Sequence, residues 1–68
     1  MKIKVKVKEL NLEMARKFFT QKKLADEIGI NPVAISLIIN GKNGASQDTA
    51  EKICKLFEKE FDDLFVLE

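Results

Sequence analysis

The first eight residues alternate between apolar and charged side chains. Ile3, Val5 and Val7 stand at odd positions, and a lysine stands at every even position from 2 to 8. A period of two with β-branched residues predicts a half-buried strand over about residues 2–7. A single strand is not stable alone, so it needs a partner. Two partners remain open, namely the C-terminal segment 65–67 or the same strand of a second subunit.

The apolar spacing becomes helical after the strand. Residues four apart predict a first helix over 11–18, and Thr20 is a favourable N-cap for a second helix. Gly29 can adopt a positive φ and is expected to end that second helix. The apolar positions behind these two predictions are Leu10, Met14 and Phe18 in the first helix and Leu24, Ala25 and Ile28 in the second.

Two further helices are predicted by their caps. Asn31-Pro32 combines an N-cap residue with proline at the first helical position, and Gly41 ends this third helix. Ser46 caps a fourth helix, after which a short last turn or helix closes the core. The residues expected to face inward are Ile35, Ile38 and Ile39, then Ala50, Ile53, Cys54 and Phe57, and finally Phe61, Leu64 and Phe65. The predicted fold is mainly α, with four to five helices and a short N-terminal strand in one domain over residues 1–68.

The second and third helices have the spacing of a helix-turn-helix over about residues 21–40. A side chain as small as Ala25 allows the two helices to cross closely, and Gly29 lets the chain turn without a Cβ clash. Ile35 and Ile38 then fix the third helix onto the second. This arrangement leaves the outer face of the third helix protruding, as major-groove binding requires.

The segment Thr20–Gly41, TQKKLADEIGINPVAISLIING, resembles the helix-turn-helix of the Cro and lambda-repressor family of bacterial and phage regulators, the XRE class. The matching elements are Thr-Gln, Leu-Ala, Gly-Ile, Ile-Ser and the final Gly-Lys, and the resemblance extends over about residues 9–65. It implies a compact lambda-repressor-like DNA-binding domain. It also implies that Gln21 touches a DNA phosphate and braces the next helix, and that Asn40, Lys42 and Asn43 hold the DNA backbone beyond the third helix.

The expected DNA-binding positions lie on both sides of the turn. Lys22, with Lys23 beside it, is in the first turn of the second helix, where a cation either binds a phosphate or is simply solvated. The groove-facing residues of the third helix are expected to be Asn31, Pro32, Val33, Ser36 and Leu37.

The sequence departs from the family at Pro32 and Leu37, where relatives usually place Arg, Gln, Lys or Ser. Without arginine or glutamine, this face cannot form the common bidentate contact with guanine. Asn31 or Asn40 can in principle pair with adenine, while Val33 and Leu37 can pack on thymine methyl groups. We therefore expect an A/T-leaning site, supplemented by DNA shape.

The composition adds constraints to this hypothesis. The net charge is +1, but it is distributed as +4 over residues 1–34 and −3 over residues 35–68, which suits contact with a polyanion at one end. There is no histidine and one cysteine, Cys54, so disulfides within the chain are excluded and a zinc site has almost no ligands. On the predicted inner stripe, Cys54 is expected to be an inert apolar residue rather than a redox sensor.

The predicted function is sequence-specific binding of double-stranded DNA by a transcriptional regulator. A phage or mobile-element repressor that acts as a homodimer in the cytoplasm fits best, with no catalytic role, no cofactor, no metal and no membrane contact. The aromatic residues Phe57, Phe61 and Phe65 and the N-terminal strand are candidate dimer surfaces, although the aromatic residues can equally close the monomer core. The alternative is a helix-turn-helix that binds a protein partner, as an antitoxin does, with little or no DNA binding.

Overall fold

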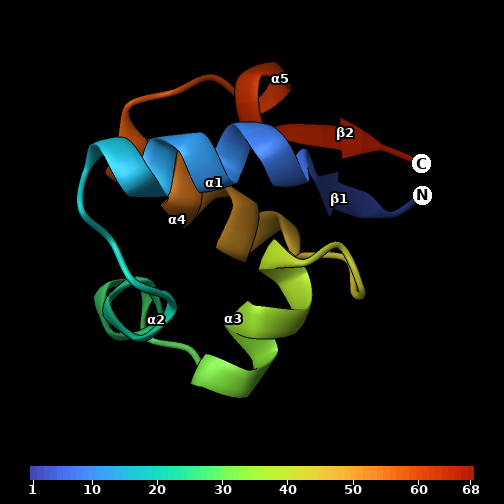
Figure 1. Cartoon of the computed structure of the whole chain (residues 1–68). Coiled ribbons are helices and arrows are strands. Elements are labelled where there is room, and N and C mark those ends of the chain that lie inside the picture. Colours follow the sequence, from blue (N-terminus) through green and yellow to red (C-terminus); the bar gives the residue numbers. More distant parts are fainter.

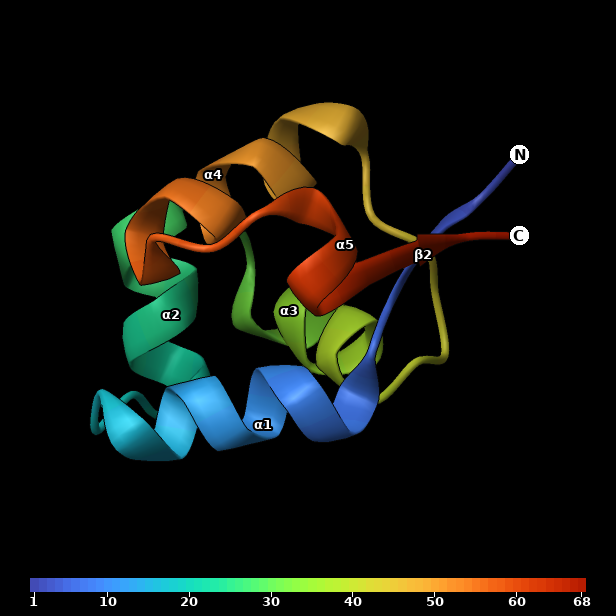
Figure 2. The same ribbon diagram turned by 90° about the horizontal axis from the view of Figure 1, so that it is seen from above.

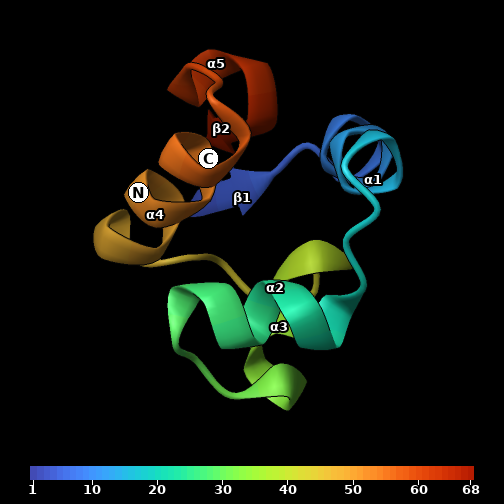
Figure 3. The ribbon, with the colours of Figure 1, turned by 90° about the vertical axis from the view of Figure 1, so that its left-hand side faces the viewer.

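A computed structural model describes all 68 residues, which form five helices and two short strands (Figure 1). Figures 1 and 3 place α2 and α3 on one side of the molecule, and α1, α5 and the strands on the other. The mainly α fold predicted from the sequence is confirmed. The elements in chain order are β1 (Ile3–Val5), α1 (Val7–Arg16), α2 (Gln21–Ile28), α3 (Pro32–Ile39), α4 (Gln47–Phe57), α5 (Phe61–Leu64) and β2 (Phe65–Leu67).

The two strands form an antiparallel pair within the chain, which resolves the question of the partner of β1. Ile3 pairs with Leu67, and Val5 pairs with Phe65. Beyond the strands, Lys2 and Glu68 exchange two backbone hydrogen bonds of 2.8 Å, so the two termini lie side by side (Figure 2). The strand β1 is shorter than the predicted 2–7 because the chain enters α1 at Val7.

The prediction for α1 was wrong at both ends. The helix runs from Val7 to Arg16 rather than over 11–18, and its first main-chain bond joins the Leu10 N–H to the Lys6 carbonyl at 2.9 Å. Val7 satisfies both patterns, since it continues the alternation and also stands three residues before Leu10. The helix ends early because Phe18 takes a left-handed conformation with φ of 60°.

Four helix ends share one capping motif. In each, the N–H after a left-handed residue donates to a carbonyl five residues earlier, as in a Schellman turn. Glycine supplies the left-handed residue after α2 and α3, whereas Phe18 and Glu58 supply it after α1 and α4. The four bonds are Phe19 to Met14, Ile30 to Ala25, Lys42 to Leu37 and Lys59 to Cys54.

One cluster of thirteen buried apolar residues joins all the elements. Ala25 and Ile35 are fully buried where α2 meets α3, as predicted, and Ile38 is also buried but lies outside this cluster. Cys54 packs against the edge of the cluster and is only partly buried, so its predicted inward position is confirmed in part. The reason is that Ile53 and Phe57 occupy the centre of the inner face of α4, and Cys54 stands to one side of them. None of the helices has the length and apolar composition of a membrane span.

Candidate nucleic-acid interface

The turn between α2 and α3 is built from local hydrogen bonds. Thr20 caps α2 by accepting from the Lys23 N–H at 3.0 Å, and Asn31 caps α3 by accepting from the Val33 N–H at 2.7 Å. Between these helices, Gly29 has a φ of 75°, a conformation that glycine adopts without a Cβ penalty. Both predicted N-caps and the predicted C-cap glycine are confirmed.

The helix α3 has a buried face and an outward face. Its buried residues, Ile35, Ile38 and Ile39, were all predicted. The opposite side carries an outer stripe, which we define as Val33, Ser36, Leu37 and Asn40. Figures 1 and 3 show the start of α3 at the lower margin of the molecule, while its last turn lies nearer the core, where α3 contacts α1 and β1. The outer stripe therefore begins at an outlying end of the molecule.

Nine of the ten predicted DNA-binding residues are exposed, and Ser36 is half-buried. Val33 is 69% exposed and Leu37 is 37% exposed, which is unusual for apolar side chains four residues apart on one helix face. The remaining exposed members are Gln21, Lys22, Asn31, Pro32, Asn40, Lys42 and Asn43. They lie at the start of α2, along α3 and in the loop after it.

The two asparagines of α3 use part of their side-chain amides within the protein. The Asn31 carbonyl oxygen accepts the capping bond, while the Asn40 Nδ2 donates to the Ser36 carbonyl at 2.8 Å. A bidentate contact with adenine needs both the oxygen and the nitrogen of one amide. Each asparagine therefore has one of these atoms already engaged, which weakens the expectation that either pairs with adenine.

Lysines flank α3 without forming ion pairs there. Lys22 and Lys42 are exposed, while the Lys23 ammonium lies 4.9 Å from the centroid of the Phe19 ring. Lys4 was not predicted as a site residue, yet its Nζ donates to the Gly41 carbonyl at 3.1 Å. This bond ties β1 to the end of α3 and places a cation near the C-terminal end of the helix dipole. No sequence pattern signals this contact, because 37 positions separate the two residues.

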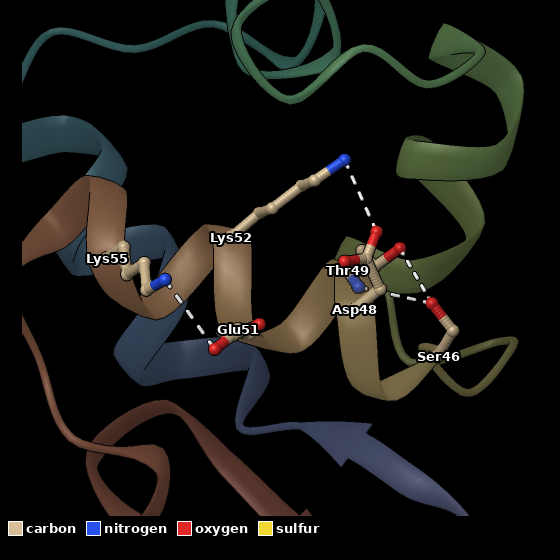
Figure 4. A network of polar contacts seen from close by, with 6 residues as sticks. All are labelled: Ser46, Asp48, Thr49, Glu51, Lys52 and Lys55. Atoms are coloured by element: carbon tan, nitrogen blue, oxygen red, sulfur yellow. Dashed lines mark hydrogen bonds and ion pairs between the residues drawn. The ribbon is translucent and has the colours of Figure 1, made fainter.

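The loop after α3 is fixed at both ends. The Ala45 N–H donates to the Ile3 carbonyl at 2.8 Å, which anchors the loop to β1. Ser46 then caps α4 by accepting from the Thr49 N–H at 3.1 Å, and its hydroxyl contacts the Thr49 hydroxyl at 3.0 Å (Figure 4). Lys42 and Asn43 are consequently carried on a short, held segment. Along α4, ion pairs join Lys52 to Asp48 and Lys55 to Glu51 (Figure 4).

The aromatic residues proposed for dimerisation belong to the monomer core. Phe57 and Phe65 are each 1% exposed, and Phe61 stacks on Phe65 with centroids 5.6 Å apart. Both strands are also paired with each other. Phe57 and Phe65 therefore take the alternative role of closing the monomer core, whereas Phe61 is only partly buried and also lines a groove beside α4. Exposed apolar side chains remain at Met1, Val66 and Leu67.

A groove beside α4, α5 and the two strands contains the cysteine, Cys54. Its volume is about 1030 Å³, and α4, α5 and the strands line it with apolar side chains from Met1, Ile3, Ala50, Cys54, Phe61 and Leu67. Burial raises the pKa of the Cys54 thiol, and the negative charges of Asp63 and Glu60 add to that effect. The thiol is therefore protonated near neutral pH and is a poor nucleophile.

The fold and the protruding α3 define a helix-turn-helix protein of the type that binds DNA. The sequence profile described as Helix-turn-helix matches residues 12–64. The chain is also 38% identical over 66 residues to YgzD of Bacillus subtilis (strain 168), described as an uncharacterized HTH-type transcriptional regulator; this match covers 97% of the chain and 96% of the relative. The chain belongs to the XRE-class helix-turn-helix family.

A solved structure supports the fold. The chain superposes with a TM-score of 0.75 on a crystal structure from Bacteroides fragilis, of a protein for which DNA binding is proposed. The superposition covers 94% of this chain and 98% of the other, with 23% sequence identity. At that identity the similarity concerns the fold alone.

Proposed function

We propose that this helix-turn-helix domain, spanning residues 1–68, is a sequence-specific regulator of transcription that inserts α3 into the major groove of double-stranded DNA. The observation that carries the proposal is the outer stripe of α3, whose apolar residues Val33 and Leu37 are exposed to solvent. Membership of a family of DNA-binding regulators supports it.

Phosphate contacts are assigned to the two ends of this surface. Gln21 and Lys22 begin α2, and Lys42 and Asn43 follow α3, so the four residues flank the outer stripe. The Gln21 side chain is exposed, so a DNA phosphate can reach it, and the bracing of α3 that the family resemblance implies is part of this proposal. Phosphate contacts set the register of a protein on DNA, and contacts to base edges supply the specificity.

The regulator is expected to act as a homodimeric repressor. One α3 helix of eight residues makes few base contacts, and a two-fold dimer doubles them over half-sites about one helical turn apart. With Phe57 and Phe65 buried, the dimer surface is assigned instead to the outer edge of β2 and the groove beside α4. Occupation of a promoter-proximal operator, such as that of a phage or mobile element, then blocks transcription. In a bacterium that DNA lies in the cytoplasm.

The test is selection from random duplex DNA, followed by affinity measurements at several salt concentrations. We expect a short symmetric site, with log affinity falling against log salt by about 0.9 per phosphate contacted. Lys22→Gln and Lys42→Gln should each weaken binding to all sequences and reduce the salt slope by about 1. Lys55→Gln is the matched control because Lys55 pairs with Glu51 on α4, and it should leave the slope unchanged.

A protein-binding role is the second candidate, and the exposure of Val33 and Leu37 is the observation that favours it. The same measurements separate the two functions. If no duplex binds in a salt-dependent manner, DNA binding is refuted and α3 becomes a docking surface for a protein. Neither function requires a catalytic group, a cofactor or a metal, and we propose none.

A further inference from the structure

The outer stripe of α3 determines which bases the protein can distinguish, given the DNA binding proposed above. The side chains of the stripe differ in exposure and in the hydrogen bonds that they already form within the protein. Val33 and Leu37 are exposed and apolar, whereas the Asn31 oxygen and the Asn40 nitrogen are engaged in bonds within the protein. Ser36 is half-buried, and its hydroxyl lies 3.4 Å from the Asn40 Nδ2. Part of the hydrogen-bonding capacity of the two asparagines is therefore already used within the protein.

The major-groove edges of the base pairs offer one strongly apolar group, the C5-methyl of thymine. We infer that Val33 and Leu37 select the site by packing on thymine methyl groups, so that 5-methylpyrimidine is the base feature the protein recognises. Val33 and Leu37 are four residues apart and share one helix face, so they lie about one turn apart along α3. Two separate methyl groups in each half-site are the corresponding ligands.

Electrostatics and solvation favour this occupant of the stripe. Lys22 in α2 and Lys42 in the loop after α3 are exposed cations, and α3 itself carries no acidic residue. Asp26 and Glu27 of α2 lie beside Lys52 and Lys55 of α4. A duplex supplies phosphates to Lys22 and Lys42 and methyl groups to the stripe at the same time. Burial of one methyl group is equivalent to about a fourfold gain in affinity.

The experiment removes the methyl groups from the DNA and leaves the protein intact. In the duplex obtained by selection, each thymine is replaced in turn by deoxyuridine, which keeps the Watson–Crick edge and lacks the methyl group. Wild-type protein should lose affinity about fourfold at two positions of each half-site. Val33→Ala should abolish the loss at one position and Leu37→Ala at the other, since each variant removes the protein side of one contact. Val33 is largely exposed, so its truncation leaves the core unchanged.

Lys42→Gln is the control for a general loss of affinity. It should weaken binding to thymine and deoxyuridine duplexes by the same factor. If wild-type protein binds both kinds of duplex within a factor of two at every position, methyl recognition is refuted while the proposed function stands. If no duplex binds in a salt-dependent manner, the proposed function fails and this inference fails with it.

Discussion

Phe18 holds a left-handed backbone conformation at the end of α1, with φ of 60° and a side chain that is 87% exposed. Its N–H donates to the Ala15 carbonyl at 3.2 Å, and the following Phe19 N–H donates to the Met14 carbonyl at 2.8 Å. Glycine occupies the same position in most such turns because it has no Cβ. The substitution Phe18→Gly should therefore stabilise the protein.

The size of the effect follows from two opposing terms. A residue with a Cβ loses about 1–2 kcal/mol in the left-handed conformation, and glycine removes that penalty. Glycine also gives the unfolded chain more freedom, which offsets the gain by about 0.4–1 kcal/mol. The ring of Phe18 is exposed, so its removal costs little apolar burial. The net gain in unfolding free energy should be about 0.5–1 kcal/mol.

Urea denaturation followed by circular dichroism measures this difference. The midpoint should rise with an unchanged m-value, and the melting temperature should rise by about 4–8 °C for each kcal/mol in a domain of this size. Phe18→Ala is the matched control because it removes the ring but keeps the Cβ, so it should give no increase. Glu58→Gly changes the equivalent residue after α4, where φ is 56°, and should behave like Phe18→Gly. Equal stability of the glycine and alanine variants at position 18 would refute backbone strain as the cause.

Three further predictions concern the turn, the helix crossing and the cysteine. Gly29→Ala should lower the unfolding free energy by about 1 kcal/mol in urea denaturation, because the φ of 75° is unfavourable for alanine. Nothing lies within 4 Å of the new Cβ, so no steric clash contributes. An unaltered midpoint would show that the turn relaxes freely. Ala25→Leu should lower the unfolding free energy by about 1–3 kcal/mol, because it overpacks a fully buried site between α2 and α3. The folded fraction of this variant should also bind DNA more weakly. A stable variant with full DNA affinity would contradict the close crossing of the two helices. Burial and the charges of Asp63 and Glu60 raise the pKa of Cys54. The pH at which a thiol reagent reaches half its maximal rate should therefore be higher for the native protein than for the urea-unfolded control. Coincident pH profiles would show that the fold does not raise the pKa of this thiol.

The helix starts could be predicted because their determinants are local. Thr20, Asn31 and Ser46 each cap a helix through a side-chain bond to a backbone N–H two or three residues later. The buried positions of α2 and α3 were equally predictable, since the spacing of their apolar residues follows the helical period. These local signals place the elements of the candidate site, whereas its DNA-binding residues were listed from the family resemblance and stay a prediction.

Features that depend on distant residues were beyond the sequence pattern. Val7 fits a strand or a helix. The Lys6 N–H donates to the Leu64 carbonyl at 2.7 Å, which extends the register of β1 and β2 by one position through a residue far along the chain. Phe18 ends α1 without the glycine that marks such a turn. Cys54 packs against the core but is only partly buried, because Ile53 and Phe57 occupy the centre of the buried face of α4.

The shortness of α3 connects its stability to its specificity. Eight residues span about 12 Å, so in the proposed complex both ends of α3 lie close to the DNA. At those ends, the amides of Asn31 and Asn40 complete the backbone hydrogen bonding of the helix. Replacement of either asparagine to gain a new base contact would disturb folding as well as binding. Val33 and Leu37 form no such cap and lie outside the core cluster, although Leu37, at 37% exposed, is more covered than Val33 at 69%. A change of DNA specificity in this fold is therefore least costly at these two positions, where a new side chain alters base contacts and leaves the caps intact.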